Sequence, residues 1–256
     1  MILAVDIGNS NMSLGVYQKK ELIHYWRLTT LRAATTDDLG VKMRTLLQSN
    51  SVSLDDIDAV VYCSVVPPLD DAFNKMCKRY IGASPLQVKP GVRTGINITY
   101  DHPREVGADR IANAVAASAQ WSGPIVVVDF GTATTLDVLS AEGDYAGGVI
   151  LPGVGISTEA LFDRAARLPR IDLSRPGRAV GKNTVDSMRS GIVYGNAGAV
   201  DSLVWQIAEE VGQPNKVVAT GGWARVIASE CKTVDEMNLY LTLEGLRIIY
   251  TRNQMN

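Results

Sequence analysis

Two short segments of this chain repeat one order of residue types, and this repeat limits the possible folds more than any other feature. Residues 2–12 and 125–135 each start with an apolar run that ends in an aspartate, Asp6 or Asp129. In both, one further residue, a glycine and several small polar residues follow. A buried strand before a glycine-led turn can bring backbone N–H groups close to phosphate oxygens. Two copies half a chain apart predict a duplicated domain, with nucleotide phosphates and a metal held between the halves.

Each aspartate also has a structural interpretation, because a strand-end aspartate often caps a turn. For one such residue alone we favour that interpretation. The paired context favours joint phosphate and cation binding, and Mg²⁺ usually takes one or two carboxylates plus substrate phosphates. The hydroxyl and amide donors after the two aspartates are Asn9, Ser10 and Asn11 in the first copy and Thr132, Thr134 and Thr135 in the second.

Length and composition are those of an ordinary globular protein. The 256 residues fit two domains of about 100–150 residues, which we expect at 1–115 and 116–256. The net charge of −2 comes without the charge runs of a nucleic-acid arm, and no apolar run approaches membrane length. Three widely spaced cysteines and no signal-peptide core favour a reduced, cytoplasmic setting. With two histidines, neither structural zinc nor a histidine-based triad is supported.

The predicted elements follow the same order twice, which favours a duplicated α/β fold with mixed sheets flanked by helices. Each half opens with three antiparallel strands and continues with alternating helices and strands. In the first half we expect strands at 2–6, 12–17, 22–28 and 58–66, with helices from Thr36, after Pro68 and at 106–121. In the second we expect strands at 125–129, 135–140, 145–150 and 216–219, with helices after Gly155 and Asn183 and two more at the end.

The start of the predicted helix at 106–121 leaves two interpretations open. Asp109 could be an N-terminal carboxylate stabilised by the helix dipole, with Arg110 in solvent. An Asp-Arg pair beside Gly107 is equally typical of a substrate clamp, in which the aspartate accepts a proton and the arginine pairs with an anion. The residues alone do not separate these alternatives.

Neither of two common nucleotide-binding motifs fits this sequence. The segment at 177–184 resembles a P-loop, but its first glycine would have to stand at Pro176, and Asn183 occupies the hydroxyl position. No G-x-G-x-x-G motif is present, which disfavours a dinucleotide-binding fold. The helix start after Gly181 could still face an anion. The Thr220-Gly221-Gly222 turn could let a base or ribose lie against bare backbone, although tight strand–helix packing also explains it.

Taken together, five motifs resemble the type III pantothenate kinases of the actin-like, sugar-kinase and Hsp70-like superfamily. They run in order over residues 1–225, and they start at Asp6, Gly107, Asp129, Gly181 and Ala219. The resemblance implies an actin-like (ribonuclease H-like) duplicated fold and a homodimer. It also implies ATP-dependent phosphorylation of the pantothenate hydroxyl, the first step of coenzyme A biosynthesis.

The resemblance also implies roles for individual residues. Asp109 would be the general base, Asp6 would lie near Mg²⁺, most simply through water, and Asp129 would hold a monovalent cation, K⁺ or NH₄⁺. Pantothenate would contact Tyr100, Gly107, Ala108, Asp109, Arg110 and Thr184, the last reaching across the dimer interface. ATP would contact Asp6, Ile7, Gly8, Asn9, Ser10, Asn11, Met12, Ser13 and Thr132. Ser10 replaces the commoner threonine, and Trp223 stands where a smaller residue is more usual.

Two rival functions follow from the same motifs. A kinase of this superfamily could act on another hydroxylated or carboxylate acceptor, such as a sugar or acetate. A regulatory nucleotide-binding protein could keep the fold without turnover, and some family members are described as accessory factors for transcription. The presence of Asp6, Asp109 and Asp129 favours catalysis, since a binding module needs no such set. No basic stripe or membrane-length segment points to a nucleic-acid or membrane partner.

Overall fold

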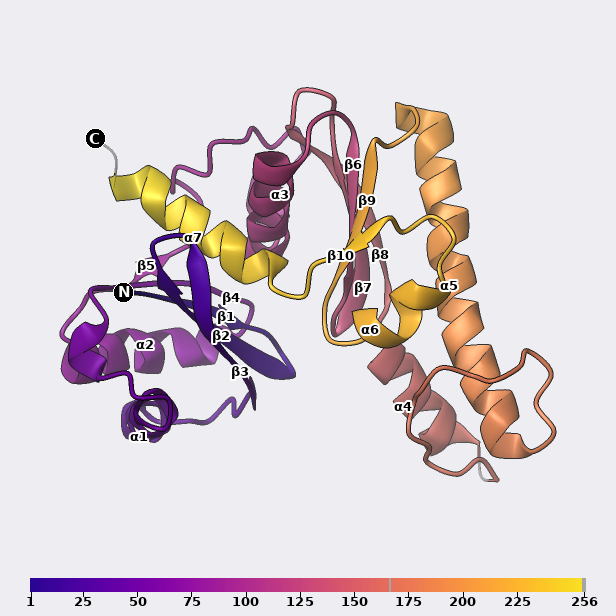
Figure 1. Cartoon of the computed structure of the whole chain (residues 1–256), viewed down its shortest axis with the longest axis horizontal. Helices are drawn as coiled ribbons and strands as arrows, with labels where there is room; N and C mark the ends of the chain where they lie inside the picture. The colour runs from indigo at the N-terminus through magenta and orange to yellow at the C-terminus, as the bar shows by residue number, and fades with distance from the viewer. Residues whose placement is uncertain (166, 255–256) are drawn as a thin grey trace. The chain divides into compact units, whose positions relative to one another are not determined.

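A computed structural model describes residues 1–165 and 167–254, and its two five-stranded sheets have the same topology (Figure 1). The strand orders are β3-β2-β1-β4-β5 and β8-β7-β6-β9-β10. In both sheets the first three strands are antiparallel and the next two pair in parallel. The predicted duplicated α/β fold is confirmed.

The elements of the first half lie close to their predicted positions. The strands are β1 (Ile2–Ile7), β2 (Asn11–Gln18), β3 (Glu21–Thr29), β4 (Ala59–Ser64) and β5 (Leu86–Gln87). The helices are α1 (Thr36–Gln48), α2 (Pro67–Met76), which continues as a π-helical turn at Cys77–Ile81, and α3 (Ala108–Gln120). Short 3₁₀ turns occupy Leu54–Asp56 and Pro103–Glu105.

The second half repeats this order of strands and helices and includes one helix of 28 residues, α5. Its strands are β6 (Ile125–Phe130), β7 (Ala133–Leu139), β8 (Tyr145–Pro152), β9 (Lys216–Thr220) and β10 (Glu236–Met237). Its helices are α4 (Val154–Arg164), α5 (Thr184–Val211), α6 (Ala224–Ile227), which a 3₁₀ turn at Ala228–Glu230 extends, and α7 (Leu241–Gln254). The predicted start after Gly155 is wrong, because α4 begins at Val154 with Gly153 as its N-cap. Strand β10 was not predicted, since two exposed residues give no apolar pattern.

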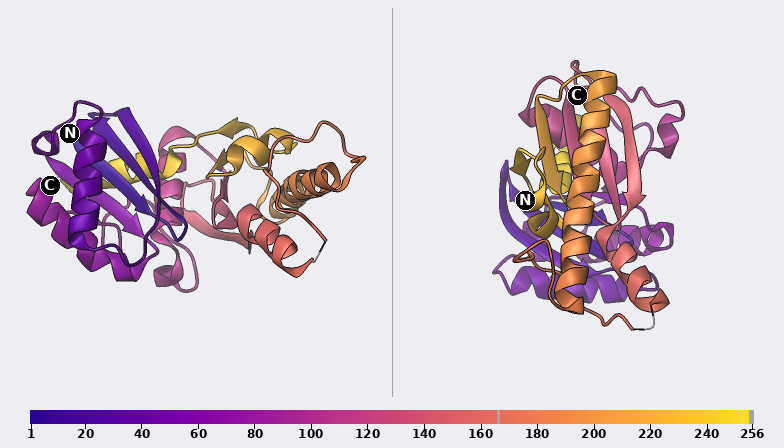
Figure 2. Two further views of the ribbon diagram at one scale, coloured as in Figure 1. Left: turned by 90° about the horizontal axis from the view of Figure 1, so that it is seen from below. Right: turned by 90° about the vertical axis from the view of Figure 1, so that its right-hand side faces the viewer.

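Alternation along the strands separates an apolar face of each sheet from a face that carries the polar strand ends. In β1, Leu3, Val5 and Ile7 join the core under α1 and α2, whereas Ala4 and Asp6 point to the opposite face. Figure 1 shows α1 and α2 on one side of the first sheet and α7 on the other. In the second half, Val126, Val128 and Phe130 belong to a core shared with α5 and α6, and Figure 2 shows α4 beside α5.

The compact units of the chain differ from the predicted division at 115/116. One unit contains Met1–Gly95, His102–Ala116 and the C-terminal residues from Leu241 on; the other contains Ile96–Asp101 and Ala117–Tyr240. Helix α7 joins the first unit because its buried side chains pack on β1, β2 and β4. It crosses α3 closely: the Cβ of any other residue at Gly245 would overlap the Ala112 carbonyl, and Thr242 Oγ1 donates to Asn113 Oδ1 at 2.7 Å.

Candidate active site

The turn after β1 is closed by its own backbone and held by residues that follow β3. The Gly8 N–H donates to the Asn11 carbonyl at 3.0 Å. The Thr30 N–H donates to the Ser10 carbonyl at 3.0 Å, and its hydroxyl donates to the Gly8 carbonyl at 2.7 Å. A compact turn of this kind can present backbone N–H groups to an anion.

Asp6 lies beside a thiol that sequence reasoning missed. Parallel pairing places Cys63 of β4 opposite Asp6, and its S–H donates to Asp6 Oδ1 at 3.2 Å. Burial raises the pKa of the Cys63 thiol well above its usual value, and the nearby Asp6 and Asp109 carboxylates raise it further. The thiol is therefore a neutral donor at physiological pH. The Asp6 and Asp109 carboxylates therefore both act electrostatically on this one thiol.

Asp109 stands in the first turn of α3, as predicted, and its carboxylate folds back over the helix start. Its Oδ1 accepts from the Arg110 N–H at 2.9 Å. A side chain at Gly107 would overlap this carboxylate, so glycine keeps the space open. Asp109 is half-buried, and the start of α3 is fixed by the crossing with α7 described above. A partly exposed carboxylate on a fixed helix start suits proton acceptance from a bound hydroxyl.

The turn after β6 is also closed by its own backbone, with a hydrogen bond that spans one residue fewer. The Gly131 N–H donates to the Ala133 carbonyl at 3.0 Å, and the Trp223 N–H donates to the Phe130 carbonyl at 3.2 Å. Here Gly153 lies against the turn: a Cβ at this position would overlap the carbonyl oxygens of Thr132 and Gly131. Thr132 itself is exposed, so its side chain is accessible to a ligand.

Asp129 has the same surroundings in its sheet that Asp6 has in the first. Strand pairing places Thr220 on one side of Asp129 and Thr135 on the other, where Asp6 has Cys63 and Ser13. Directly paired residues point to the same face of a sheet. Each aspartate is therefore flanked on its face by two residues that can donate or accept hydrogen bonds.

Tyr100 and Thr184, two predicted pantothenate contacts, belong to the second unit. The main-chain and side-chain donors of Thr99 both bind the Tyr145 carbonyl, at 2.9 and 3.0 Å, and the Tyr100 ring meets the Tyr145 ring edge-on. Thr184 is exposed at the first position of α5, and with Lys182 and Asn183 it lines an open groove of about 960 Å³. Thr184 is thus accessible to a ligand, whereas Tyr100 is half-buried.

Two residues of the predicted ATP segment can contribute only their backbone. Ile7 is fully buried and Met12 nearly so, and both belong to the core under α1 and α2. Asn9 and Ser10 are exposed, and Asn11 and Ser13 are half-buried. Side-chain contacts with a ligand are therefore restricted to the polar residues of this segment.

Comparison with known proteins identifies the family. Residues 2–206 match the type III pantothenate kinase family. Type III pantothenate kinases from Halalkalibacterium halodurans and Geobacter sulfurreducens are 49% and 48% identical to this chain over 99% of its length and all of theirs. The enzyme from Anaeromyxobacter sp. strain K is 50% identical over the same extent. The chain belongs to the type III pantothenate kinase family.

Solved structures with low sequence identity to this chain resemble it in fold. A Campylobacter jejuni protein described as a Baf family transcriptional activator has a TM-score of 0.58 and 20% identity, with 98% of each chain covered. The ethanolamine utilization protein EutJ from Carboxydothermus hydrogenoformans has a TM-score of 0.56 and 13% identity, covering 96% of this chain and 89% of its own. These similarities support the duplicated fold and carry no functional argument.

Within residues 1–165 and 167–254, no group of three or more histidine, cysteine, aspartate or glutamate side chains could hold a metal ion. Mg²⁺ bound by one or two carboxylates, waters and substrate phosphates needs no such group. No helix among the same residues is long and apolar enough to cross a membrane.

Proposed function

We propose that the protein transfers the γ-phosphoryl group of ATP to the hydroxyl of pantothenate, forming 4′-phosphopantothenate and ADP. The observation that carries this proposal is the family match over nearly the whole chain, at 48–50% identity to named type III pantothenate kinases. Asp6 at the end of β1 and the half-buried Asp109 in the first turn of α3 support it, because a kinase needs a cation-binding carboxylate and a proton acceptor.

In the proposed reaction, Asp109 orients the pantothenate hydroxyl and accepts its proton. A bond forms between the hydroxyl oxygen and the γ-phosphorus, and the bond from that phosphorus to the ADP oxygen breaks. Transition states of this kind are mostly loose, so the protein contributes chiefly by positioning and charge neutralisation. Gly107 and Ala108 would leave room for pantothenate beside the base, and Arg110, Tyr100 and Thr184 would contact it.

The proposal assigns cation binding to the two strand-end aspartates. Asp6 would hold Mg²⁺ through water, where the ion would neutralise charge on the phosphates. Asp129 would hold K⁺ or NH₄⁺ close to the turn that carries Thr132. ATP would contact residues 6–13 and Thr132. We further propose a cytoplasmic homodimer, in which Thr184 reaches the partner's pantothenate, and no nucleic-acid partner.

The first test measures ADP release by the purified protein with ATP, Mg²⁺ and K⁺, with and without pantothenate. We expect pantothenate-dependent ADP that falls sharply when Na⁺ replaces K⁺. Release that depends on a sugar or acetate would move the protein to another acceptor, and the absence of any acceptor-dependent release would favour a binding role.

The second test replaces the proposed base. Asp109→Asn should lower kcat by roughly 10²–10⁴-fold, the usual contribution of a general base, and leave ATP binding largely intact. Asp37→Asn is the matched control, because Asp37 is an exposed carboxylate in the first turn of α1. Near-normal turnover by Asp109→Asn would remove Asp109 from the mechanism.

A further inference from the structure

Residues 30–32, here called the brace, hold the turn after β1 through three hydrogen bonds. Two contacts come from Thr30, as given above, and the third comes from Arg32, whose Nη2 donates to Asn9 Oδ1 at 3.0 Å. All of these residues belong to the first compact unit. Three consecutive positions of the turn, from Gly8 to Ser10, are thus tied to one short segment.

The pattern of these bonds suits a turn that binds anions. The carbonyl oxygens of a turn repel phosphate, whereas its N–H groups attract it. In this turn the Gly8, Ser10 and Asn11 carbonyls each accept a bond from within the protein, two of them from Thr30. Bonds that tie the carbonyl oxygens to the protein fix the orientation of the peptide planes, and with it the direction of the N–H groups.

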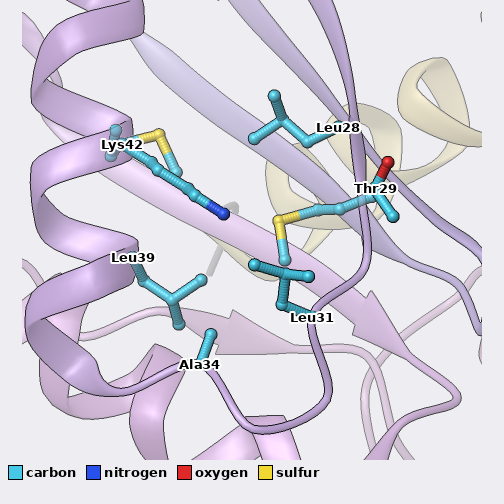
Figure 3. Close-up of a pocket in the computed structure, with 8 residues that line it drawn as sticks. Leu28, Thr29, Leu31, Ala34, Leu39 and Lys42 are labelled. Atoms are coloured by element: carbon cyan, nitrogen blue, oxygen red, sulfur yellow. The ribbon is translucent and has the colours of Figure 1, made fainter.

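The brace also borders a small, mostly apolar cavity. Leu31 and Ala34 line a small cavity together with Leu28 and Thr29 of β3 and Leu39 and Lys42 of α1 (Figure 3). Met12, which directly follows the turn, lines the same cavity. At about 10 Å³ the cavity is too small for a ligand larger than water. Residues of the brace, of α1 and of the strand that follows the turn line this cavity together.

We propose that Thr30 is a positioning residue for nucleotide binding, which presents the turn at residues 8–11 to the phosphates through its hydroxyl. This inference rests on the proposed function, since it takes the nucleotide to be the ligand of that turn. The hydroxyl bond to Gly8 is the contact that a substitution can remove, because the Thr30 N–H bond to Ser10 belongs to the backbone.

The test compares Thr30→Val with Thr30→Ser and Thr45→Val. Valine has the shape of threonine and removes only the hydroxyl, so we expect the ATP KM and the ADP dissociation constant to rise roughly 3- to 10-fold, the effect of one hydrogen bond. The KM for pantothenate and the melting temperature should change much less. Serine should restore ATP affinity. The exposed Thr45 of α1 serves as the matched control, because its hydroxyl also donates to a carbonyl, that of Val41 at 2.9 Å.

The outcomes separate the inference from the proposed function. Unchanged ATP and ADP affinity in Thr30→Val, with normal pantothenate turnover by the wild type, would overturn the inference alone. Calorimetric titration with ADP needs no acceptor, so it decides the role of Thr30 even if the wild type shows no pantothenate-dependent ADP. An equal rise of both KM values with a lower melting temperature would mean a general structural role and would also overturn the inference.

Discussion

In the first unit, polar side chains hold the turn after β1, whereas in the second unit the backbone of Gly153 lies against the turn after β6. Thr30 and Gly153 occupy the same topological position, the first residue after the third strand of their sheets. In the first unit, residues 30–35 separate β3 from α1 and can supply polar contacts. In the second, Gly153 alone separates β8 from α4, so strand, turn and helix must approach closely.

This difference predicts unequal tolerance to substitution. A hydrogen bond contributes a modest net free energy, and its loss leaves the turn some freedom to adjust. Contact between two backbone segments leaves no space for a side chain, and overpacking forces the chain to move. The second turn should therefore respond more strongly to a single added methyl group than the first turn does to a lost hydroxyl.

The largest effect is expected for Gly153→Ala. The new methyl group would overlap the Thr132 and Gly131 carbonyls, which should cost about 1–3 kcal/mol and lower the melting temperature by roughly 3–10 °C. The turn that carries Thr132 must shift, so the KM for ATP should also rise. Scanning calorimetry and initial-rate assays measure the two effects.

Gly155→Ala is the matched control for this prediction. Gly155 is two residues along in α4, and a methyl group there would meet only Trp223 Nε1 at 3.5 Å, an ordinary contact distance. Alanine also favours helix, so stability should be unchanged or slightly higher. Equal melting temperatures for Gly153→Ala and the wild type would show that the second turn adjusts as readily as the first.

A smaller and more specific effect is expected from Cys63, the donor beside Asp6 whose counterpart beside Asp129 is Thr220. Cys63→Ala removes the donor to Asp6 Oδ1 and should raise the Mg²⁺ concentration for half-maximal activity roughly 3- to 10-fold. Cys63→Ser keeps a hydroxyl donor, as the second sheet does with Thr220, and should stay close to the wild type. Mg²⁺ titrations at saturating substrates measure the effect.

Cys77→Ala controls for the loss of buried volume. Cys77 is fully buried in the same unit, and burial raises the pKa of its thiol to about 12. Its replacement should lower the melting temperature without changing the Mg²⁺ requirement. If Cys63→Ala and Cys77→Ala gave the same Mg²⁺ curve, the thiol would have no role in positioning Asp6.

The smallest effect concerns the helices that follow the two turns. Helix α1 has a capping box formed by Thr35 and Asp38, whereas the N-cap of α4 is Gly153, which has no side chain to form a cap. Thr35→Ala should lower the melting temperature at neutral pH by about 2–4 °C. Hydrogen bonds from the backbone and side chain of Thr35 lower the pKa of Asp38 below its usual 3.8.

The pH dependence of this effect has a defined sign. Because the folded-state pKa of Asp38 is lowered, its contribution to stability is present above pH 3.8 and is lost as the pH falls through the folded-state value. The gap in melting temperature between the wild type and Thr35→Ala should therefore narrow in acid. A gap that stays constant down to about pH 2 would show that the cap does not depend on the Asp38 charge.

Sequence reasoning located the two turns because the features that make them are local. A buried apolar run, a strand-end aspartate and a glycine two residues later specify strand and turn within about ten residues, as at Asp6 and Asp129. The start of α3, with Asp109 in its first turn, was predictable for the same reason. The identity of the ligands was inferred from the family resemblance, because no local sequence pattern specifies pantothenate.

Only the tertiary structure placed Cys63 beside Asp6, Thr30 over the turn at residues 8–11 and α7 on the first sheet. Cys63 is 57 residues from Asp6, and their contact depends on the parallel register of β1 and β4. Register is set by the packing of whole strands, since a shift by one residue would turn every side chain to the other face. The sequence by itself therefore determined the two aspartates and their turns, and long-range pairing decided which side chains support them.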